Sequence, residues 1–338
     1  MNILYILVGF LAFGFLVIAH EFGHFIVARL NNVKVEEFSL GMGPKIIGIK
    51  GKETEYLIKA LPIGGYVKML GEEGQSDDPR AFSNKSPLRK LSIVSAGPIM
   101  NILLAIVLFT IVGYSRGVAT TQIGEVVDDK PAKAAGIMVN DVIKEIDGKQ
   151  ITTWNDLSNA IVNSEGKELT ITIERDSEII IKKVKPFYDE KSKEYKIGIA
   201  AKVARPSITK SISTGFEETF SLIKLTFSAF GQIFQGKVSK DDIGGPITIF
   251  RVSTQMAREG TTQLLAFVAF ISIQLAIFNI IPFPALDGGW IFIFLLEIIT
   301  RRRLNEKVVG IANYIGFSIL MLLMIVVLIK DILFPVQF

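Results

Sequence analysis

Cysteine is absent from the 338 residues, and histidine occurs only twice, at His20 and His24. Without cysteine the chain can form no disulfide, hold no metal through a thiolate and use no cysteine nucleophile. Any imidazole that binds a metal must therefore be one of these two. The net charge is only +4, and because the lysines and arginines follow the apolar segments, we interpret it as a sign of membrane topology and expect no nucleic-acid partner.

Long apolar runs are abundant, since 49% of the residues are hydrophobic. Each of four segments exceeds the roughly 20 residues that cross a 30 Å hydrocarbon core. The segments are about 3–30, 91–114, 264–299 and 309–333. The first has no basic region before it and no small-residue cleavage site, so we interpret it as a span rather than a signal peptide.

Basic residues indicate the orientation of these spans. None precedes Arg29, whereas the loop 31–90 is rich in them and the link 300–308 contains Arg301, Arg302 and Arg303. The positive-inside rule places both loops in the cytoplasm. Both termini and the insert after the second span are then expected outside.

We interpret the insert between the second and third apolar segments as a water-exposed α/β domain. Residues 117–203 alternate short strands with turns, one of them at Asp147-Gly148, and contain a helix capped near Asn155. On "DKPAKAAGIMVNDVIKEIDGKQI" and "WNDL" this stretch resembles a PDZ domain of the bacterial protease-associated type. PDZ domains bind peptides by strand addition, so a peptide ligand is one interpretation and a spacer without a tight ligand is the other.

Two further segments have sequence patterns that indicate association with the membrane surface. Apolar residues recur at helical spacing over 208–236, which indicates a helix lying on the outer leaflet or docked on a neighbouring domain. These residues are Phe216, Phe220, Ile223, Phe227, Phe230 and Phe234. In the cytoplasmic loop, residues 53–70 alternate like a strand around a Gly-Gly break, which suggests a β-hairpin reaching back to the membrane.

The stretch "HEFGH" places ionisable groups within the first apolar run. Residues four apart on a helix share a face, so His20 and His24 can reach one metal ion. Glu21 lies between them and can contact a metal-bound water without being a ligand, which is the H-E-x-x-H pattern of zinc proteases. The alternative is a pair of interior histidines hydrogen-bonded across a bundle, but ionisable groups inside a span are usually functional.

Catalytic zinc usually takes three protein ligands. With no other histidine and no cysteine, the third must be a carboxylate at membrane depth, and the candidates are Asp287 and Glu297. Asp287 lies in "FNIIPFPALDGGW", where prolines and glycines break the helix, and such backbone is tolerated only where it lines a protein-enclosed cavity. Glu297 lies on an uninterrupted apolar helix near "TRRR". We therefore expect Asp287.

These motifs together resemble the site-2 protease family of intramembrane zinc metalloproteases, of the regulator-of-sigma-E type with a single PDZ domain. The motifs are "HEFGH", "FSLGMGPK", "PIGGYVKM", "SAGPIMN", "GGPI" and "NIIPFPALDGG". The resemblance implies Zn2+ held by His20, His24 and Asp287, with Glu21 as the catalytic glutamate.

The same resemblance implies residues that handle the substrate. They are Asn279, Asn101 and the hairpin around 53–70, which would pair edge-on with an unwound substrate at Tyr66 and Val67. Glu21 would take a proton from water and deliver it to the leaving amine.

The expected fold class is an α-helical polytopic membrane protein with four transmembrane helices and one inserted extracytoplasmic α/β PDZ domain. The transmembrane helices are expected at 1–30, 91–115, 263–299 and 309–333, the cytoplasmic loops at 31–90 and 300–308, the PDZ domain at 116–205 and an amphipathic, membrane-associated region at 206–262.

The expected function is hydrolysis of a peptide bond within or near the transmembrane segment of single-pass membrane proteins, such as anti-sigma factors or remnant signal peptides. The expected location is the bacterial inner (plasma) membrane, with the lipid bilayer as a partner and the active site toward the cytoplasm. A non-catalytic PDZ-type receptor or chaperone is the alternative, but it would need neither Glu21 nor Asp287. A zinc transporter would show ligands along a path across several helices.

Overall fold

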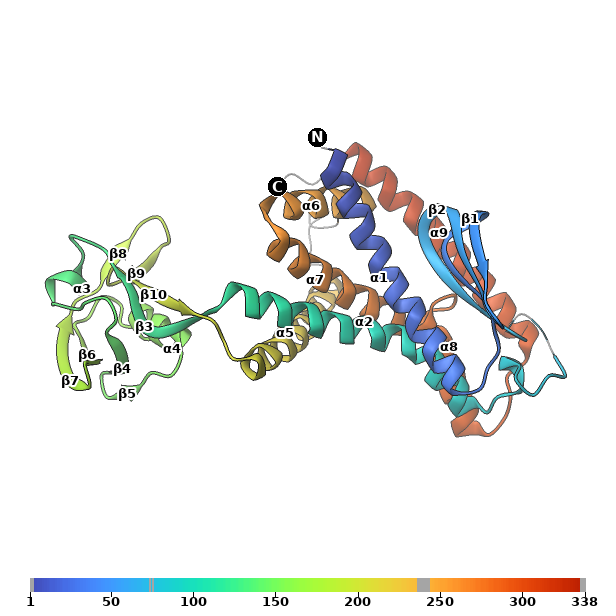
Figure 1. Ribbon diagram of the computed structural model, residues 1–338, viewed down its shortest axis with the longest axis horizontal. Helices are drawn as coiled ribbons and strands as arrows, with labels where there is room; N and C mark the ends of the chain where they lie inside the picture. Colours follow the sequence, from blue (N-terminus) through green and yellow to red (C-terminus); the bar gives the residue numbers. More distant parts are fainter. Residues whose placement is uncertain (1–2, 73, 75, 236–243, 335–338) are drawn as a thin grey trace. The chain divides into compact units, whose positions relative to one another are not determined.

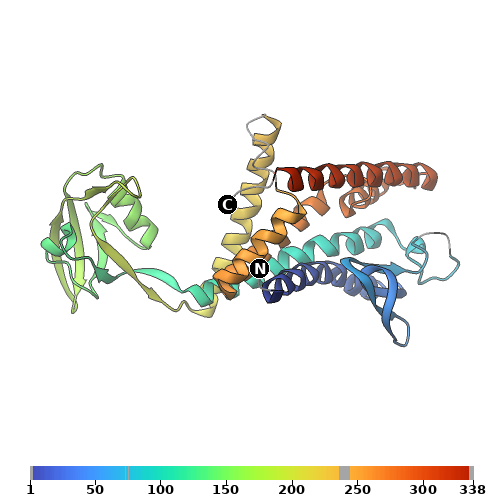
Figure 2. The same cartoon turned by 90° about the horizontal axis from the view of Figure 1, so that it is seen from above.

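The computed structural model describes residues 3–72, 74, 76–235 and 244–334 (Figures 1 and 2). The chain divides into a mainly helical unit, Met1–Val112 with Ile212–Phe338, and a β-rich unit, Gly113–Ser211.

Among the described residues, four helices are long and apolar enough to cross a membrane. They are α1 (Ile3–Leu30), α2 (Pro87–Arg116), α7 (Thr261–Ile280) and α9 (Glu306–Leu333). Apolar side chains of α1, α2 and α7 form one buried cluster, which includes Leu16, Phe109 and Ile273. The unit also contains η1 (Phe82–Asn84), α5 (Ile208–Phe234), α6 (Pro246–Glu259) and α8 (Asp287–Thr300).

The structure divides the predicted span 264–299 into two helices, because α7 ends at Ile280 and α8 begins at Asp287. The linking residues contain Pro282 and Pro284, which cannot donate backbone hydrogen bonds. Ala285 adopts a φ of +73°, outside the helical region. The break therefore gives α8 a free N-terminus at Asp287.

The helical unit also carries a small antiparallel sheet made of β1 (Val35–Lys50) and β2 (Glu55–Met69). Both strands curve, so that Ser39 pairs with Tyr66 on one side and with Leu57 on the other, while Leu57 also pairs with Gly48. β2 contacts α1, and both figures show the sheet beside that helix. The prediction of a hairpin within 53–70 is therefore wrong: the Gly-Gly break bends one strand, and its partner is 35–50.

The amphipathic segment forms α5, which docks on the helical unit through one face. Thr219 is fully buried, and Ile223 and Phe230 pack against the cluster formed by α1, α2 and α7. Phe216, Phe220 and Phe227 remain exposed, while the side chain of Phe234 and residues 236–243 lie outside the described part. α5 thus buries one side against protein and leaves a phenylalanine stripe on the other.

The β-rich unit is built around a sheet with strand order β10-β3-β4-β6-β7. Its elements are β3 (Val118–Val126), α3 (Pro131–Ala134), β4 (Val142–Ile146), β5 (Lys149–Gln150), α4 (Trp154–Val162), β6 (Leu169–Arg175), β7 (Glu178–Val184), β8 (Phe187–Asp189), β9 (Glu194–Lys196) and β10 (Ile199–Ala204). Ile143, Ile171 and Leu157 lie in its core, which packs α4 on the sheet.

The β-rich unit contains the predicted turn, and its predicted helix begins earlier than expected. Asp147 and Gly148 both have positive φ, as the predicted turn requires. The helix begins earlier than predicted, because Thr153 rather than Asn155 caps it, in a capping box with Asp156.

The buried Asp141 carboxylate ties two parts of the β-rich unit together. Its two oxygens accept hydrogen bonds from Arg175 at 2.7 and 2.8 Å, and one also accepts from the Met138 N–H at 2.8 Å. Burial raises the pKa of Asp141, but these hydrogen bonds outweigh burial and hold the pKa below its ordinary value. The stabilisation is therefore complete above the ordinary carboxyl pKa and is lost as pH falls through the lowered one.

Replacing Asp141 with Asn should lower the local stability of the β-rich unit at pH 7 by about 1–3 kcal/mol, because Arg175 loses a charged partner. Hydrogen exchange of β4 and β6 amides in the whole protein, corrected for intrinsic rates, measures the change. The wild-type advantage should begin to decline as pH falls below about 4 and disappear as pH falls through the lowered pKa of Asp141. Glu190→Gln, at an exposed turn, is the control, and equal protection of Asp141→Asn and wild type at pH 7 would contradict the assignment.

Candidate metal centre

α1 brings the two histidines together on one buried face. His20 and His24 lie one turn apart, and their Nε2 atoms are 3.3 Å from each other. The helix is apolar on all sides before His20, so these rings are the polar groups that it delivers to the interior of the bundle. The chain offers no other histidine that could share the site.

Asp287 completes the group from the first residue of α8. Its Oδ2 lies 3.1 Å from His20 Nε2 and 3.4 Å from His24 Nε2. The same oxygen is buried and has no hydrogen-bond partner among the described residues. Three potential ligand atoms from distant parts of the sequence therefore converge on one point.

The spacing of these three atoms fits a zinc ion. Zinc binds nitrogen and oxygen ligands at about 2.0–2.1 Å in tetrahedral geometry, which separates any two ligand atoms by about 3.3–3.4 Å. The three observed separations are 3.1, 3.3 and 3.4 Å. A cation between the atoms also removes the repulsion between lone pairs that otherwise face one another in a buried place.

Residues of α2 contact the Nδ1 atoms of both rings, on the side away from the ligand group. The Nδ1 of His24 is 2.9 Å from the Ile93 carbonyl oxygen, and the Nδ1 of His20 is 3.2 Å from the side-chain amide of Asn101. Between these two positions lies Gly97, where a β-carbon would come within 2.7 Å of His20 Cε1 and would also meet the His24 ring. The absence of a side chain at Gly97 therefore gives the imidazoles their room.

Glu21 lies beside the sheet. A β-carbon added at Gly65 of β2 would be 3.1 Å from Glu21 Cγ, so the β2 backbone borders the glutamate next to the ligand pair. The competing carboxylate Glu297 lies ten residues beyond Asp287 on α8, about 15 Å along the axis, where it accepts a hydrogen bond from the Leu304 N–H at 3.0 Å.

The residues predicted to handle substrate occupy different environments. Asn101 is fully buried against His20, whereas Asn279 is half-buried on the last turn of α7. The Tyr66 hydroxyl donates to Glu37 and accepts from Lys59. Val67 is buried in the cluster between the sheet and the helices, so only its backbone could meet another chain.

Sequence reasoning missed Gly97 and the Ile93 carbonyl. Gly97 stands within "SAGPIMN", so the motif contained the signal, but its role depends on which residues of α1 lie opposite. A backbone carbonyl has no signal in the side-chain sequence.

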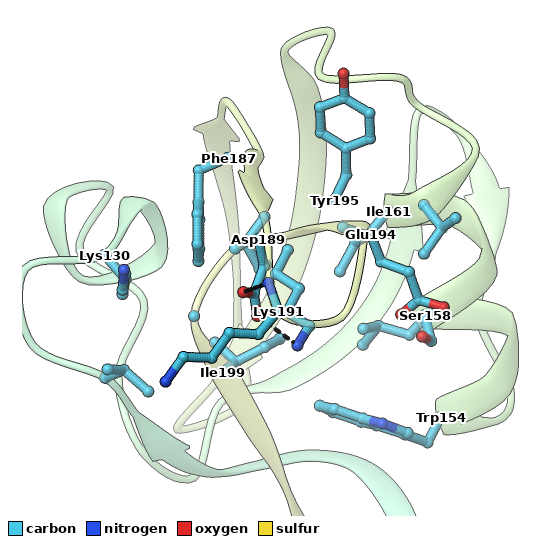
Figure 3. A pocket seen from close by; sticks show the side chains of 16 residues that line it. Lys130, Trp154, Ser158, Ile161, Phe187, Asp189, Lys191, Glu194, Tyr195 and Ile199 are labelled. Atoms are coloured by element: carbon cyan, nitrogen blue, oxygen red, sulfur yellow. Dashed lines mark hydrogen bonds and ion pairs between the residues drawn. The ribbon is translucent and has the colours of Figure 1, made fainter.

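The β-rich unit has a separate cavity of about 600 Å³. α4 contributes Trp154, Leu157 and Ile161 to its lining, and the loop and strand at Gly198 and Ile199 contribute the facing part. Figure 3 shows Trp154 on one side of the pocket and Phe187 with Lys130 on the other, and the Lys130 Nζ lies 4.2 Å from the Phe187 ring centre. The pocket is thus largely apolar, and its lining carries charges of both signs, with three lysines and the acidic Asp189 and Glu194.

Comparison with known proteins gives consistent similarities. A family model described as peptidase family M50 matches residues 8–323. The chain is 47% identical over 339 residues to "Putative zinc metalloprotease CA_C1796" of Clostridium acetobutylicum, covering 100% of both chains. It is 27% identical over 405 residues to "Regulator of sigma-W protease RasP" of Bacillus subtilis, covering 95% of this chain and 96% of the relative.

Among solved structures, the chain is similar to the PDZ domain of an SdrC-like protein of Listeria monocytogenes. The identity is 24%, and the match covers 25% of this chain and 87% of that chain with a TM-score of 0.22.

Gly97→Ala should reduce the amount of zinc bound per chain, because the new methyl group would collide with both imidazoles. Metal analysis of purified protein measures the loss. Gly14→Ala is the matched control, since nothing lies within 4 Å of a β-carbon at Gly14 of α1. Full zinc content in Gly97→Ala would contradict the assigned packing.

Proposed function

Because the chain belongs to peptidase family M50, the site-2 type of zinc metalloprotease, we propose that it hydrolyses a peptide bond within or near the transmembrane segment of single-pass membrane proteins. The family and the zinc metalloprotease class are as the motifs predicted. The observation that carries the proposal is the convergence of His20, His24 and Asp287 inside a unit with four membrane-length helices.

The proposed roles follow from the chemistry of each residue. His20, His24 and Asp287 would hold the zinc ion, which when bound supplies Lewis acidity for the carbonyl and lowers the pKa of water. Glu21 directly follows His20 and lies three residues before His24, and its carboxylate is not among the converging ligand atoms. It would accept the proton from the attacking water and pass it to the leaving amine.

A helical substrate must unwind before its peptide bond can be reached, since its carbonyls are occupied by hydrogen bonds within the helix. The closeness of the β2 backbone to Glu21, whose Cγ would lie 3.1 Å from a β-carbon added at Gly65, supports a role for the sheet in this step. A substrate segment that pairs with β2 near Tyr66 and Val67 would lie extended beside Glu21. Asn279, at the end of α7, is the remaining candidate for a side-chain contact with substrate.

Two substrate classes fit this chemistry. The name "Regulator of sigma-W protease" of the Bacillus subtilis relative supports regulatory single-pass proteins such as anti-sigma factors. Remnant signal peptides are the second class. A Glu21→Gln variant that binds substrate without cutting it would identify the class by the proteins that co-purify with it.

We further propose that the chain lies in the bacterial inner membrane with the loops 31–90 and 300–308 in the cytoplasm. Arg301, Arg302 and Arg303 follow the end of α8, which supports this orientation by the positive-inside rule. Both termini and the β-rich unit would then be outside. The apolar pocket of that unit would receive an extended peptide, in the way that PDZ domains bind by strand addition.

The two rival functions have less support. A receptor or chaperone has no need for three ligand atoms at zinc spacing. A zinc transporter requires successive sites along a path, and among the described residues His20, His24 and Asp287 form the one candidate metal cluster.

Glu21→Gln should retain zinc and lose cleavage, because the amide cannot accept the proton from water. We expect the rate to fall by about 10²–10⁴-fold or more, measured on a single-pass substrate in detergent. Glu297→Gln is the control: it replaces another glutamate of the helical unit, keeps the oxygen that accepts from Leu304, and should remain active. Cleavage by Glu21→Gln at the wild-type rate would refute the mechanism.

The absence of cysteine makes the orientation directly testable. Single cysteines at Ser177 in the β-rich unit and at Asp77 in the loop 31–90 are both at exposed positions. A membrane-impermeant thiol reagent should label Ser177→Cys in cells with an intact inner membrane and label Asp77→Cys only after lysis. The reverse pattern would overturn the proposed orientation.

A further inference from the structure

The tautomer of His24 is set by the backbone of α2. Its Nδ1 is 2.9 Å from the Ile93 carbonyl oxygen, and a carbonyl can only accept a hydrogen bond. Nδ1 therefore carries the hydrogen, and Nε2 presents its lone pair toward Asp287 and His20. This is the arrangement that a neutral imidazole ligand needs.

His20 has the same requirement but a different partner. Its Nε2 also faces the ligand group, at 3.1 Å from Asp287 Oδ2. For Nε2 to offer its lone pair to a zinc ion, Nδ1 must carry the hydrogen of the neutral ring. The group opposite Nδ1, at 3.2 Å, is the side-chain amide of Asn101. For Nδ1–H to donate, the amide must turn its oxygen toward the ring.

A half-turn of the Asn101 amide provides this arrangement, because it exchanges Oδ1 and Nδ2. With Nδ2 toward the ring, Oδ1 is buried and has no hydrogen-bond partner among the described atoms. Turning the amide gives that oxygen the Nδ1–H of His20.

The position of Asn101 suits a supporting role. Its side chain is 0% exposed, and its backbone carbonyl accepts a hydrogen bond from Ser272 of α7 at 2.9 Å. The residue is therefore fixed between α2 and α7 and directed at His20, with no exposed surface to offer a substrate.

From these contacts we propose that Asn101 is a positioning residue for zinc: its Oδ1 accepts from His20 Nδ1–H and holds the ring with Nε2 toward the metal. The inference rests on the proposed zinc site. It replaces the substrate contact expected for Asn101 from the sequence, and leaves Asn279 as the asparagine available for substrate.

The test compares zinc affinity, by chelator competition, in the whole detergent-purified protein. Asn101→Leu has a similar volume but no acceptor, and should bind zinc about 10–100-fold more weakly. Asn101→Asp keeps an acceptor oxygen and should retain most of the affinity. Asn279→Leu, the matched control, should bind zinc as wild type does. The visible spectrum of Co2+-loaded protein should shift in Asn101→Leu and not in Asn279→Leu, because only the former releases a ligand ring.

Each outcome decides the inference. Wild-type zinc affinity and Co2+ spectrum in Asn101→Leu would overturn it, and so would an equal loss of affinity in Asn101→Asp. If Asn101→Leu proves unstable, the Asn101→Asp variant still decides. A wild-type protein that binds no zinc would instead overturn the proposed function, so the two failures are distinguishable.

Discussion

The structure depends on keeping three polar ligand groups in the interior of an apolar helical unit. Two imidazoles and a carboxylate are expensive to bury unless each is partnered. Here the Nε2 atoms of His20 and His24 and the Oδ2 of Asp287 face one another, and a zinc ion bound between them would satisfy all three at once. The helices that carry them must therefore approach one another to within the reach of short side chains.

The close approach of the helices explains why glycine occupies several positions near the ligand residues. At Gly23 a β-carbon would be 2.8 Å from the Ala96 carbonyl carbon, and at Gly97 it would meet the two histidine rings. Small residues of this kind let helix backbones come close in membranes. At the third ligand, Gly288 faces the Ile280 and Ile281 carbonyls, so the chain can turn tightly from α7 into α8 and present Asp287 at a helix start.

Features that depend on residues close together in the sequence could be predicted from it, whereas features that depend on tertiary contacts could not. The four long apolar helices follow from composition and are confirmed, as is a β-rich domain that lies between the second and third of them in sequence. The pairing of His20 with His24 is local to one helix turn. Elimination of other ligand types leaves Asp287 and Glu297, and the prolines and glycines beside Asp287 favour it. The prediction of a hairpin within 53–70 is wrong because tertiary contacts, and not the local sequence, pair strand 55–69 with strand 35–50. The role of Gly97 needed the register of α2 against α1, which one sequence does not contain.

Helix geometry explains how one face of α2 contacts both histidine rings. Ile93, Gly97 and Asn101 are spaced by four residues and so lie along one face. Helix carbonyls point toward the C-terminus, while Cα–Cβ bonds tilt toward the N-terminus. The Ile93 oxygen, one turn before Gly97, and the Asn101 side chain, one turn after it, therefore both point along the helix toward Gly97. Two histidines one turn apart on α1 can thus both be held by α2 only if the middle residue has no side chain.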